Sequence, residues 1–239
     1  GDGDGDSDGD DSNRNKKSNE KRPPQIIIEE VEEAIRNCTS KHIDFEGYSK
    51  LRLQHADRQF RENLVTLFNN VLFNVDEPLP NAWLHSILFP KLKSGKANNE
   101  IESYRPIALS SMICGLFQRI LLRRMLLEIR HKINPSQFGL QPDCSTELLL
   151  NGVASFIEDS QKKRLGYDLN EYITNGTLGK AIGVALDWKD AYCKISPYRV
   201  VDSFLKKDGN PFYAKFLLKW MTNRTIQTKI GNWTSRRRK

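Results

Sequence analysis

The spacing of hydrophobic residues along the chain predicts mainly helices. Between Arg58 and Phe73 the apolar positions recur every three or four residues, which is the spacing of an amphipathic helix. Residues 116–129 are apolar on nearly every side and are expected to form a buried helix. A shorter amphipathic helix is expected from about Ile26 to before Asn37.

Capping residues predict three further helices. Ser145 or Thr146 can cap a helix whose apolar residues continue to Ile157. Ser196-Pro197 and Asn210-Pro211 each place proline directly after an N-cap residue, so two helices are expected there, with Gly209 as the break between them.

Short apolar runs predict a small number of strands. Residues 83–90 read as a strand that leads into a basic, turn-rich loop at residues 91–100, as in a hairpin. Residues 181–186 alternate apolar and small residues and are expected to deliver Asp187 to the end of a strand. A final hairpin is expected at residues 225–235. Helices combined with short strands predict an α+β fold.

Charge is distributed unevenly along the chain. The net charge of +7 includes six aspartates among the first 11 residues, so the rest of the chain carries +13. Residues 1–24 have almost no apolar side chains and are expected to be a disordered acidic and polar linker. A basic body indicates a polyanionic partner, although a solvated basic face without a partner has the same composition.

Several classes of protein are disfavoured by the sequence. The four cysteines are widely spaced and form no metal-binding pattern, so they are expected to be free thiols of an intracellular protein. No run of 18 apolar residues and no apolar leader occur, so nothing indicates a membrane or secretion. A chain that starts with Gly1 and stops at the basic residues 236–239 is expected to be part of a longer polypeptide.

Two carboxylates follow the expected strand at residues 181–186. Asp187 and Asp190 could be bridged by a divalent cation to a phosphate. The alternative is that these aspartates only form a turn, which is common at strand ends.

The segment 187–192 (DWKDAY) resembles the first catalytic motif of reverse transcriptases, and three other stretches match that family in the same order. Residues 83–93 followed by 103–109 (SYRPIAL) resemble the fingers signature. Residues 137–140 with Ser145-Thr146 resemble the Gln-x-Gly-Phe stretch, with Leu140 in place of the usual aromatic. Asn223-Arg224 and the hairpin after them resemble the segment that leads to a Gly-x-Pro-Gln-Gly motif. The pattern is similar to non-LTR (LINE-type) retrotransposon enzymes.

This resemblance implies roles for the DWKDAY residues. Asp187 would bind both catalytic Mg²⁺ ions, and the carbonyl of Trp188 would help to hold one of them. Tyr192 would be the aromatic gate that selects deoxynucleotides. In many LINE-type members an aspartate follows the aromatic, whereas this chain has Cys193 there. The residues that would lie under the incoming triphosphate are Lys189, Asp190, Ala191 and Tyr192.

The resemblance also implies nucleotide and template contacts. Arg105 matches the triphosphate-clamping arginine, whose planar fork suits phosphate oxygens. Lys91 and Lys93 could close over the same phosphates or could be solvated loop residues. Gln137, Phe138 and Gly139 would contact template or primer, with core packing as the alternative for Phe138. The arginines at 119, 123 and 124 could follow a nucleic-acid backbone, but a polar stripe on an otherwise apolar helix is more often its solvent face.

As a whole, the resemblance implies the fingers (residues 25–180) and N-terminal palm (residues 181–239) of a right-hand polymerase. Its partners would be an RNA template, a DNA primer and deoxynucleoside triphosphates, with no membrane, in the cytoplasm and nucleus. An endonuclease upstream and further palm and thumb regions downstream are also implied. No Tyr/Phe-x-Asp-Asp motif follows Asp187 in the printed sequence, so the fragment alone is expected to be inactive.

Two other interpretations remain at this point. A degenerate or domesticated module could bind RNA or DNA through the same basic surface without catalysis. An unrelated structural or interaction protein would make the order of the motifs a coincidence.

Overall fold

The protein is an α+β chain in a computed structural model that describes residues 22–39, 43–74, 76–165, 185–187 and 194–238. Helices are combined with one four-stranded sheet that contains both parallel and antiparallel pairs. The chain divides into two compact units, one formed by residues up to Arg130 together with Ser196–Lys239, and the other by His131–Ile195. The expected α+β class is confirmed.

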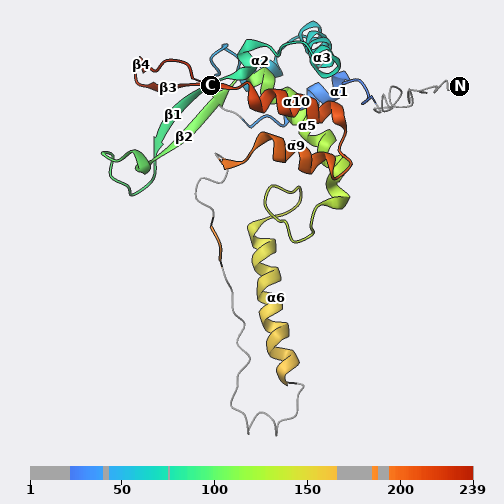
Figure 1. Cartoon of the computed structure of the whole chain (residues 1–239), viewed down its shortest axis with the longest axis vertical. Coiled ribbons are helices and arrows are strands. Elements are labelled where there is room, and N and C mark those ends of the chain that lie inside the picture. The colour runs from blue at the N-terminus through green and yellow to red at the C-terminus, as the bar shows by residue number, and fades with distance from the viewer. Residues whose placement is uncertain (1–21, 40–42, 75, 166–184, 188–193, 239) are drawn as a thin grey trace, which may run out of the picture. The chain divides into compact units, whose positions relative to one another are not determined.

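Figure 1 shows how the helices of the first unit are arranged, and several of them begin after a residue whose side chain caps them. The side chains of Asp57, Ser111 and Asn210 each accept a hydrogen bond from a backbone N–H of the helix that follows. These bonds satisfy N–H groups that have no partner within the helix. The helices are α1 (Ile28–Arg36), α2 (Lys50–Gln54), α3 (Arg58–Phe73), α4 (Asn81–Leu84), α5 (Met112–Ile129), α9 (Pro197–Leu205) and α10 (Pro211–Thr222).

The structure confirms most of the expected helices and corrects some of the expected boundaries: α5 begins at Met112 rather than Leu116, and β1 continues to Leu92 rather than Pro90. The helix predicted at 58–73 is α3, and the helices predicted after Ser196 and Asn210 are α9 and α10. The strand expected from Trp83 starts instead at His85, because Asn81–Leu84 form one helical turn that begins at Pro80. The short helices α2 and α4 were not predicted.

Gly209 separates α9 from α10, as predicted, and its place tolerates no larger residue. It is buried, and its N–H donates to the carbonyl of Phe204 at 3.1 Å. A Cβ added to Gly209 would lie 2.4 Å from Cζ of the Phe204 ring. Glycine therefore lets the chain turn tightly against the end of α9.

Aromatic rings form the centre of the core of the first unit. The ring centroid of Phe117 on α5 lies 5.2 Å from those of Phe68 and Trp83 and 4.9 Å from that of Phe216. Phe117 and Phe68 are fully buried. These contacts join α3, α4, α5 and α10 into one hydrophobic core.

The sheet has the strand order β2-β1-β3-β4. Strand β1 (His85–Leu92) pairs antiparallel with β2 (Tyr104–Ser110) and parallel with β3 (Thr225–Ile230), which pairs antiparallel with β4 (Trp233–Thr234). The two predicted hairpins, β1–β2 and β3–β4, are confirmed. In Figure 1 the β1–β2 hairpin extends away from the helices, with its loop at the far end.

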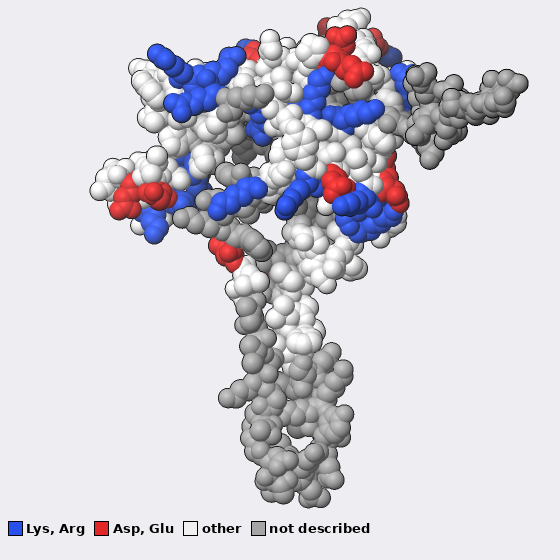
Figure 2. Space-filling model, viewed as in Figure 1, with Lys and Arg blue, Asp and Glu red and all other residues white. Residues whose placement is uncertain are grey.

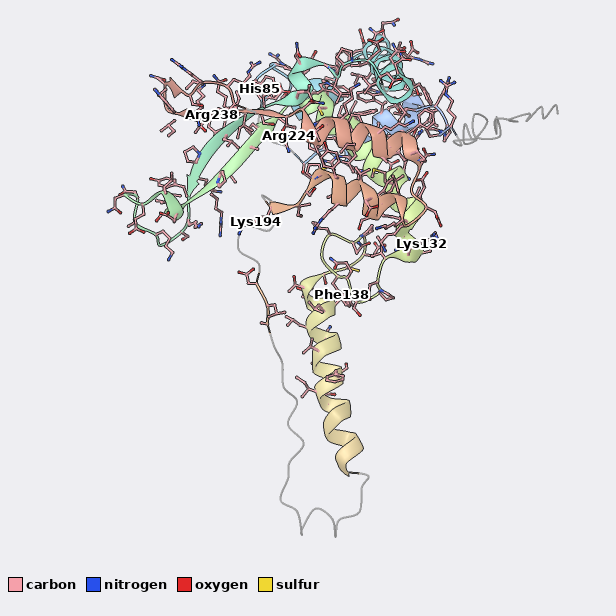
Figure 3. All side chains as sticks on the ribbon, in the orientation of Figure 1. His85, Lys132, Phe138, Lys194, Arg224 and Arg238 are labelled. Carbon is pink, nitrogen blue, oxygen red and sulfur yellow. The ribbon has the colours of Figure 1, made fainter. Side chains whose placement is uncertain are left out.

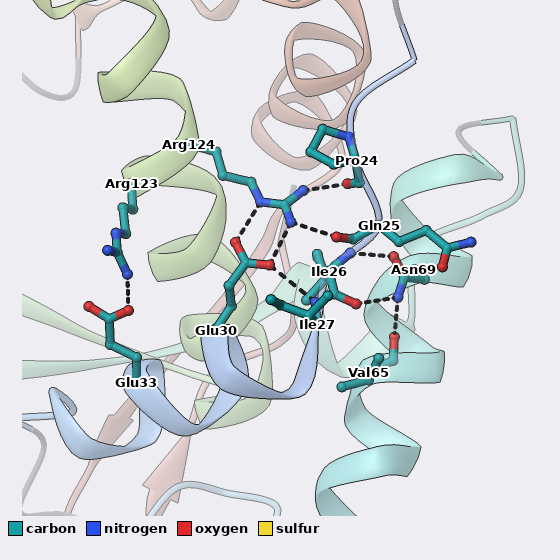
Figure 4. A network of polar contacts seen from close by, with 10 residues as sticks. All are labelled: Pro24, Gln25, Ile26, Ile27, Glu30, Glu33, Val65, Asn69, Arg123 and Arg124. Atoms are coloured by element: carbon teal, nitrogen blue, oxygen red, sulfur yellow. Dashed lines mark hydrogen bonds and ion pairs between the residues drawn. The ribbon is translucent and has the colours of Figure 1, made fainter.

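The segment before α1 is held against α3 and α5 by polar contacts (Figure 4). The guanidinium of Arg124 donates to the Glu30 carboxylate and to the carbonyls of Pro24 and Gln25. The amide of Asn69 accepts from the N–H of Ile26 at 2.8 Å and donates to its carbonyl at 2.9 Å. We call this set of contacts the N-terminal clasp. Residues 1–21 of the predicted linker lie outside the described residues.

The second unit contains α6 (Thr146–Leu165). Ser145 caps this helix by accepting the N–H of Leu148 at 3.2 Å, which confirms the helix predicted after that residue. The domain boundary predicted at residues 180 and 181 lies outside the described residues. No helix within the described ranges is long and apolar enough to span a membrane.

Candidate functional site

The β1–β2 hairpin brings two predicted phosphate-binding residues side by side. Lys91 on β1 is the direct antiparallel partner of Arg105 on β2, and both side chains are exposed. Residues directly opposite each other in an antiparallel pair point to the same face of the sheet, and like charges in such positions repel. An anion bound by both side chains would remove this repulsion.

Lys93 lies at the start of the hairpin loop and forms hydrogen bonds to the residues that follow the loop. Its N–H donates to the carbonyl of Ser103 at 2.8 Å, and its Nζ donates to the carbonyl of Glu102 at 2.6 Å. The hydroxyl of Tyr104 closes the loop by donating to the carbonyl of Asn98 at 2.9 Å. The ammonium of Lys93 therefore braces the loop in this structure, while Lys91 and Arg105 carry the exposed charge on the strands.

The root of the hairpin contains two serines that were not predicted as site residues, and an arginine for which no role was predicted. Ser86, on β1, is 1% exposed, and its Oγ lies 3.0 Å from the Oγ of Ser110 on β2. Arg224, which precedes β3, donates from Nη2 to the Oγ of Ser86 at 3.3 Å. The position of Ser86 in the mainly apolar strand β1 was the signal for the serine. Figure 3 shows Arg224 near His85, where β1 leaves the helices.

His85 is buried at the start of β1. Its Nδ1 lies 3.3 Å from the Oγ1 of Thr225, and its ring meets that of Phe45 edge-on. Burial, with a smaller contribution from the charge of Arg237, lowers the pKa of His85 below its ordinary value of 6.5. The fold therefore favours the neutral form of this imidazole.

We expect the stability of the fold to decrease in mild acid because of His85. The unfolded chain takes up this proton below about pH 6.5, whereas the folded chain takes it up only at lower pH. The contribution of His85 to stability is therefore complete above pH 6.5 and is lost as the pH falls through its lowered folded pKa. Urea unfolding between pH 7 and pH 5 measures this loss, which should be smaller in His85→Gln. The exposed His55→Gln variant should behave like the native chain; a native-like acid response of His85→Gln would contradict the assignment.

The sequence predicts a strand at residues 181–186, and the structure describes its last two residues, which are not in a strand. Ala185, Leu186 and Asp187 form no regular secondary structure, and Leu186 is 80% exposed. A strand needs a neighbour that pairs with its backbone, and none of the described strands pairs with these residues. The prediction was therefore wrong for Ala185 and Leu186. Residues 181–184 of the same strand lie outside the described residues, as do Trp188, Lys189, Asp190, Ala191 and Tyr192.

The described residues do not by themselves make a magnesium site. Asp187 is exposed, and the described ranges contain no group of three or more His, Cys, Asp or Glu side chains placed to hold a metal ion. Magnesium requires several fixed oxygens around it. Asp187 belongs to the second unit and Arg105 to the first.

The residues expected to contact template or primer form a turn in the second unit. The side-chain amide of Gln137 donates to the carbonyl of Gly139 at 3.1 Å, and its N–H donates to the carbonyl of Asn134 at 2.9 Å. Phe138 is partly buried and lies in the loop before α6 (Figure 3). The contact of this turn with nucleic acid stays a prediction.

Two of the three arginines on α5 are engaged in ion pairs within the protein. Arg124 pairs with Glu30, and Arg123 pairs with Glu33 on the same helix α1. Arg119 is exposed. Figure 2 shows basic side chains spread over one face of the molecule, with acidic side chains gathered in a few patches. Arg123 and Arg124 therefore help to attach α1 to α5, and a contact of these arginines with a nucleic-acid backbone stays a prediction.

Comparison with known proteins gives an informative similarity. No protein-family model matches the chain. The chain is 27% identical over 134 residues to the RNA-directed DNA polymerase from the mobile element jockey of Drosophila melanogaster. The match covers 55% of this chain but only 13% of that protein. It confirms the resemblance, first indicated by the order of the motifs, to the reverse transcriptases of non-LTR retrotransposons.

Proposed function

We propose that this chain is part of the RNA-directed DNA polymerase of a non-LTR retrotransposon and that its β1–β2 hairpin holds the triphosphate of the incoming deoxynucleotide. The observation that carries the proposal is the cross-strand pair of Lys91 and Arg105, in a chain similar to the jockey polymerase. Two exposed cations on one face of a hairpin form a suitable site for a polyphosphate.

The chemistry of the two side chains fits this role. The guanidinium of Arg105 can offer two parallel N–H donors to phosphate oxygens, whereas the ammonium of Lys91 acts as a compact charge. Phosphoryl transfer depends mainly on positioning and on charge stabilisation, so cations fixed in place before the substrate arrives are effective. The hairpin backbone fixes the spacing of both residues through the β1–β2 register.

The remaining roles extend this proposal to the whole protein. Its architecture would be the fingers and N-terminal palm of a right-hand polymerase. Asp187 would be one carboxylate of a site for two Mg²⁺ ions, and the carbonyl of Trp188 would help to hold one of them. Residues 189–192 would lie under the triphosphate, and residues 137–139 would lie against template or primer. The ions, when bound, would neutralise charge during nucleotidyl transfer. RNA template, DNA primer and deoxynucleoside triphosphates would be the partners, in the cytoplasm and nucleus.

Removal of Arg105 should weaken binding of a deoxynucleoside triphosphate to this chain. Hydrogen bonds to charged groups contribute about 1.5–3 kcal/mol, so Arg105→Ala should raise the dissociation constant about tenfold. Lys91→Ala should have a smaller effect because an ammonium group cannot offer two parallel N–H donors to the phosphate oxygens. Titration calorimetry at low salt measures both.

A control with the same change of charge separates a local site from general electrostatic attraction. Arg58→Ala also removes one exposed positive charge, but from α3, away from the hairpin (Figure 1). It should leave triphosphate binding nearly unchanged. Equal losses in Arg58→Ala and Arg105→Ala would count against the hairpin site. Salt-dependent RNA binding without such a site would favour the non-catalytic nucleic-acid-binding module.

A further inference from the structure

Arg224 occupies the junction between the last helix and the sheet. It lies between α10 and β3, and its guanidinium carbon is 4.5 Å from the centroid of the Trp220 ring. The same guanidinium donates to the Oγ of Ser86, which in turn lies 3.0 Å from the Oγ of Ser110. One side chain therefore links α10 to both strands of the β1–β2 hairpin.

Neighbouring contacts fix the same junction from the helical side. The indole Nε1 of Trp220 donates to the carbonyl of Trp83 at 3.2 Å, and the Oγ1 of Thr225 donates to the carbonyl of Leu84 at 3.4 Å. Both carbonyls belong to the turn that leads directly into β1. The ring that supports Arg224 is thus itself fixed to the start of the hairpin.

We propose that Arg224 is a positioning residue for the triphosphate-binding pair Lys91 and Arg105, acting through Ser86 at the root of the hairpin. This inference rests on the proposed function, because it assumes that the hairpin binds a triphosphate. Arg224 itself would not contact the triphosphate. Its role is to set the direction in which the hairpin leaves the helices.

The length of the hairpin makes its root important. Lys91 is five residues beyond Ser86, or about 16 Å along β1 at the usual rise of a strand. A tilt of about 10° at Ser86 would move Lys91 by about 3 Å, whereas productive sites need side chains placed to within about 0.5 Å. A small loosening at the root would therefore misplace both cations.

Arginine is suited to this junction in a way that lysine is not. Its flat guanidinium can lie over the indole ring while one of its N–H groups still reaches the serine hydroxyl. Lysine could keep the charge near Trp220, but its ammonium group cannot stack on the indole ring and donate to Ser86 in the same geometry. Arg224→Lys should therefore restore only part of the function lost in Arg224→Ala.

The experiment measures binding of a deoxynucleoside triphosphate to the full chain, well below the midpoint of thermal unfolding of the least stable variant. Arg224→Ala should weaken binding about fivefold and Arg224→Lys about twofold. These effects are smaller than that of Arg105→Ala because the lost contact, from Arg224 to Ser86, positions the site but does not touch the ligand. Ser86→Ala should also weaken binding. The double variant should bind no more weakly than Arg224→Ala alone, because both changes break the same link.

Two control variants distinguish a loss of positioning from a loss of stability and from a failure of the proposed function. Leu72→Val creates a small cavity in the buried core, away from the hairpin, and should lower the thermal midpoint without changing triphosphate affinity. Arg105→Ala removes a proposed triphosphate-binding side chain and so tests whether the hairpin binds the ligand at all.

Weakened binding in Arg105→Ala combined with native affinity in Arg224→Ala would overturn the positioning role and leave the proposed function standing. Native affinity in Arg105→Ala would overturn both. If Arg224→Ala does not fold, Arg224→Lys and Ser86→Ala still decide the question, because native affinity in both would overturn the proposal.

Discussion

Replacement of Arg124 by methionine should lower the free energy of unfolding by about 3 kcal/mol, as expected when one partner of a largely buried ion pair is removed. The side chain of Arg124 is 11% exposed and that of Glu30 is 21% exposed. Their shortest N–O distance is 2.5 Å, and Arg124 also donates to the carbonyls of Pro24 and Gln25 at 2.6 and 2.8 Å. Methionine would keep much of the packing but leave a carboxylate and two carbonyls without this donor.

Arg123→Met provides the matched control on the same helix. Arg123 also pairs with a glutamate of α1, but its side chain is 58% exposed, so its loss should cost less than about 1 kcal/mol. Urea unfolding at neutral pH measures both variants. Similar destabilisation by the two substitutions would show that the N-terminal clasp does not depend on the buried pair.

The helices were predictable because their signals are local. The apolar spacing of residues 58–73 and the Ser-Pro and Asn-Pro pairs define α3, α9 and α10 within a few residues. The β1–β2 and β3–β4 hairpins were predictable for the same reason, because each joins strands that are neighbours in sequence. The short α4 was missed because a buried Trp83 within an apolar run fits a strand equally well.

Long-range pairings could not be predicted from the pattern. Strand β1 pairs in parallel with β3, so that His85 lies beside Thr225, 140 residues later. The partners of Arg123 and Arg124 are on α1, about 90 residues earlier, so a polar stripe on α5 could not reveal them. The strand expected before Asp187 failed at Ala185 and Leu186 because alternation of residues specifies a strand only where a partner strand exists.

The candidate site was predictable in part. The Tyr-Arg-Pro-Ile context singled out Arg105, and the loop composition singled out Lys91 and Lys93. Only the register showed that Lys91 and Arg105 face each other, and only the hydrogen bonds showed that Lys93 braces the loop. The contribution of Arg224 required the three-dimensional contact with Ser86.

Substitution of Asp187 by alanine should reduce DNA synthesis by the full-length product of the gene at least about 10³-fold. Loss of a ligand to a catalytic metal removes several kcal/mol of charge stabilisation, and each 1.36 kcal/mol corresponds to about a tenfold change in rate. Asp202→Ala is the control, since it removes an exposed carboxylate on α9 that pairs with Lys206 of the same helix. Its synthesis should stay close to that of the native protein.

Primer extension on an RNA template in Mg²⁺, with these three proteins, tests the central claim that the chain is part of a reverse transcriptase. We expect synthesis of complementary DNA by the native protein and by Asp202→Ala, and none above background by Asp187→Ala. A folded native protein that binds nucleic acid but extends no primer, or an Asp187→Ala variant that extends it normally, would contradict the account.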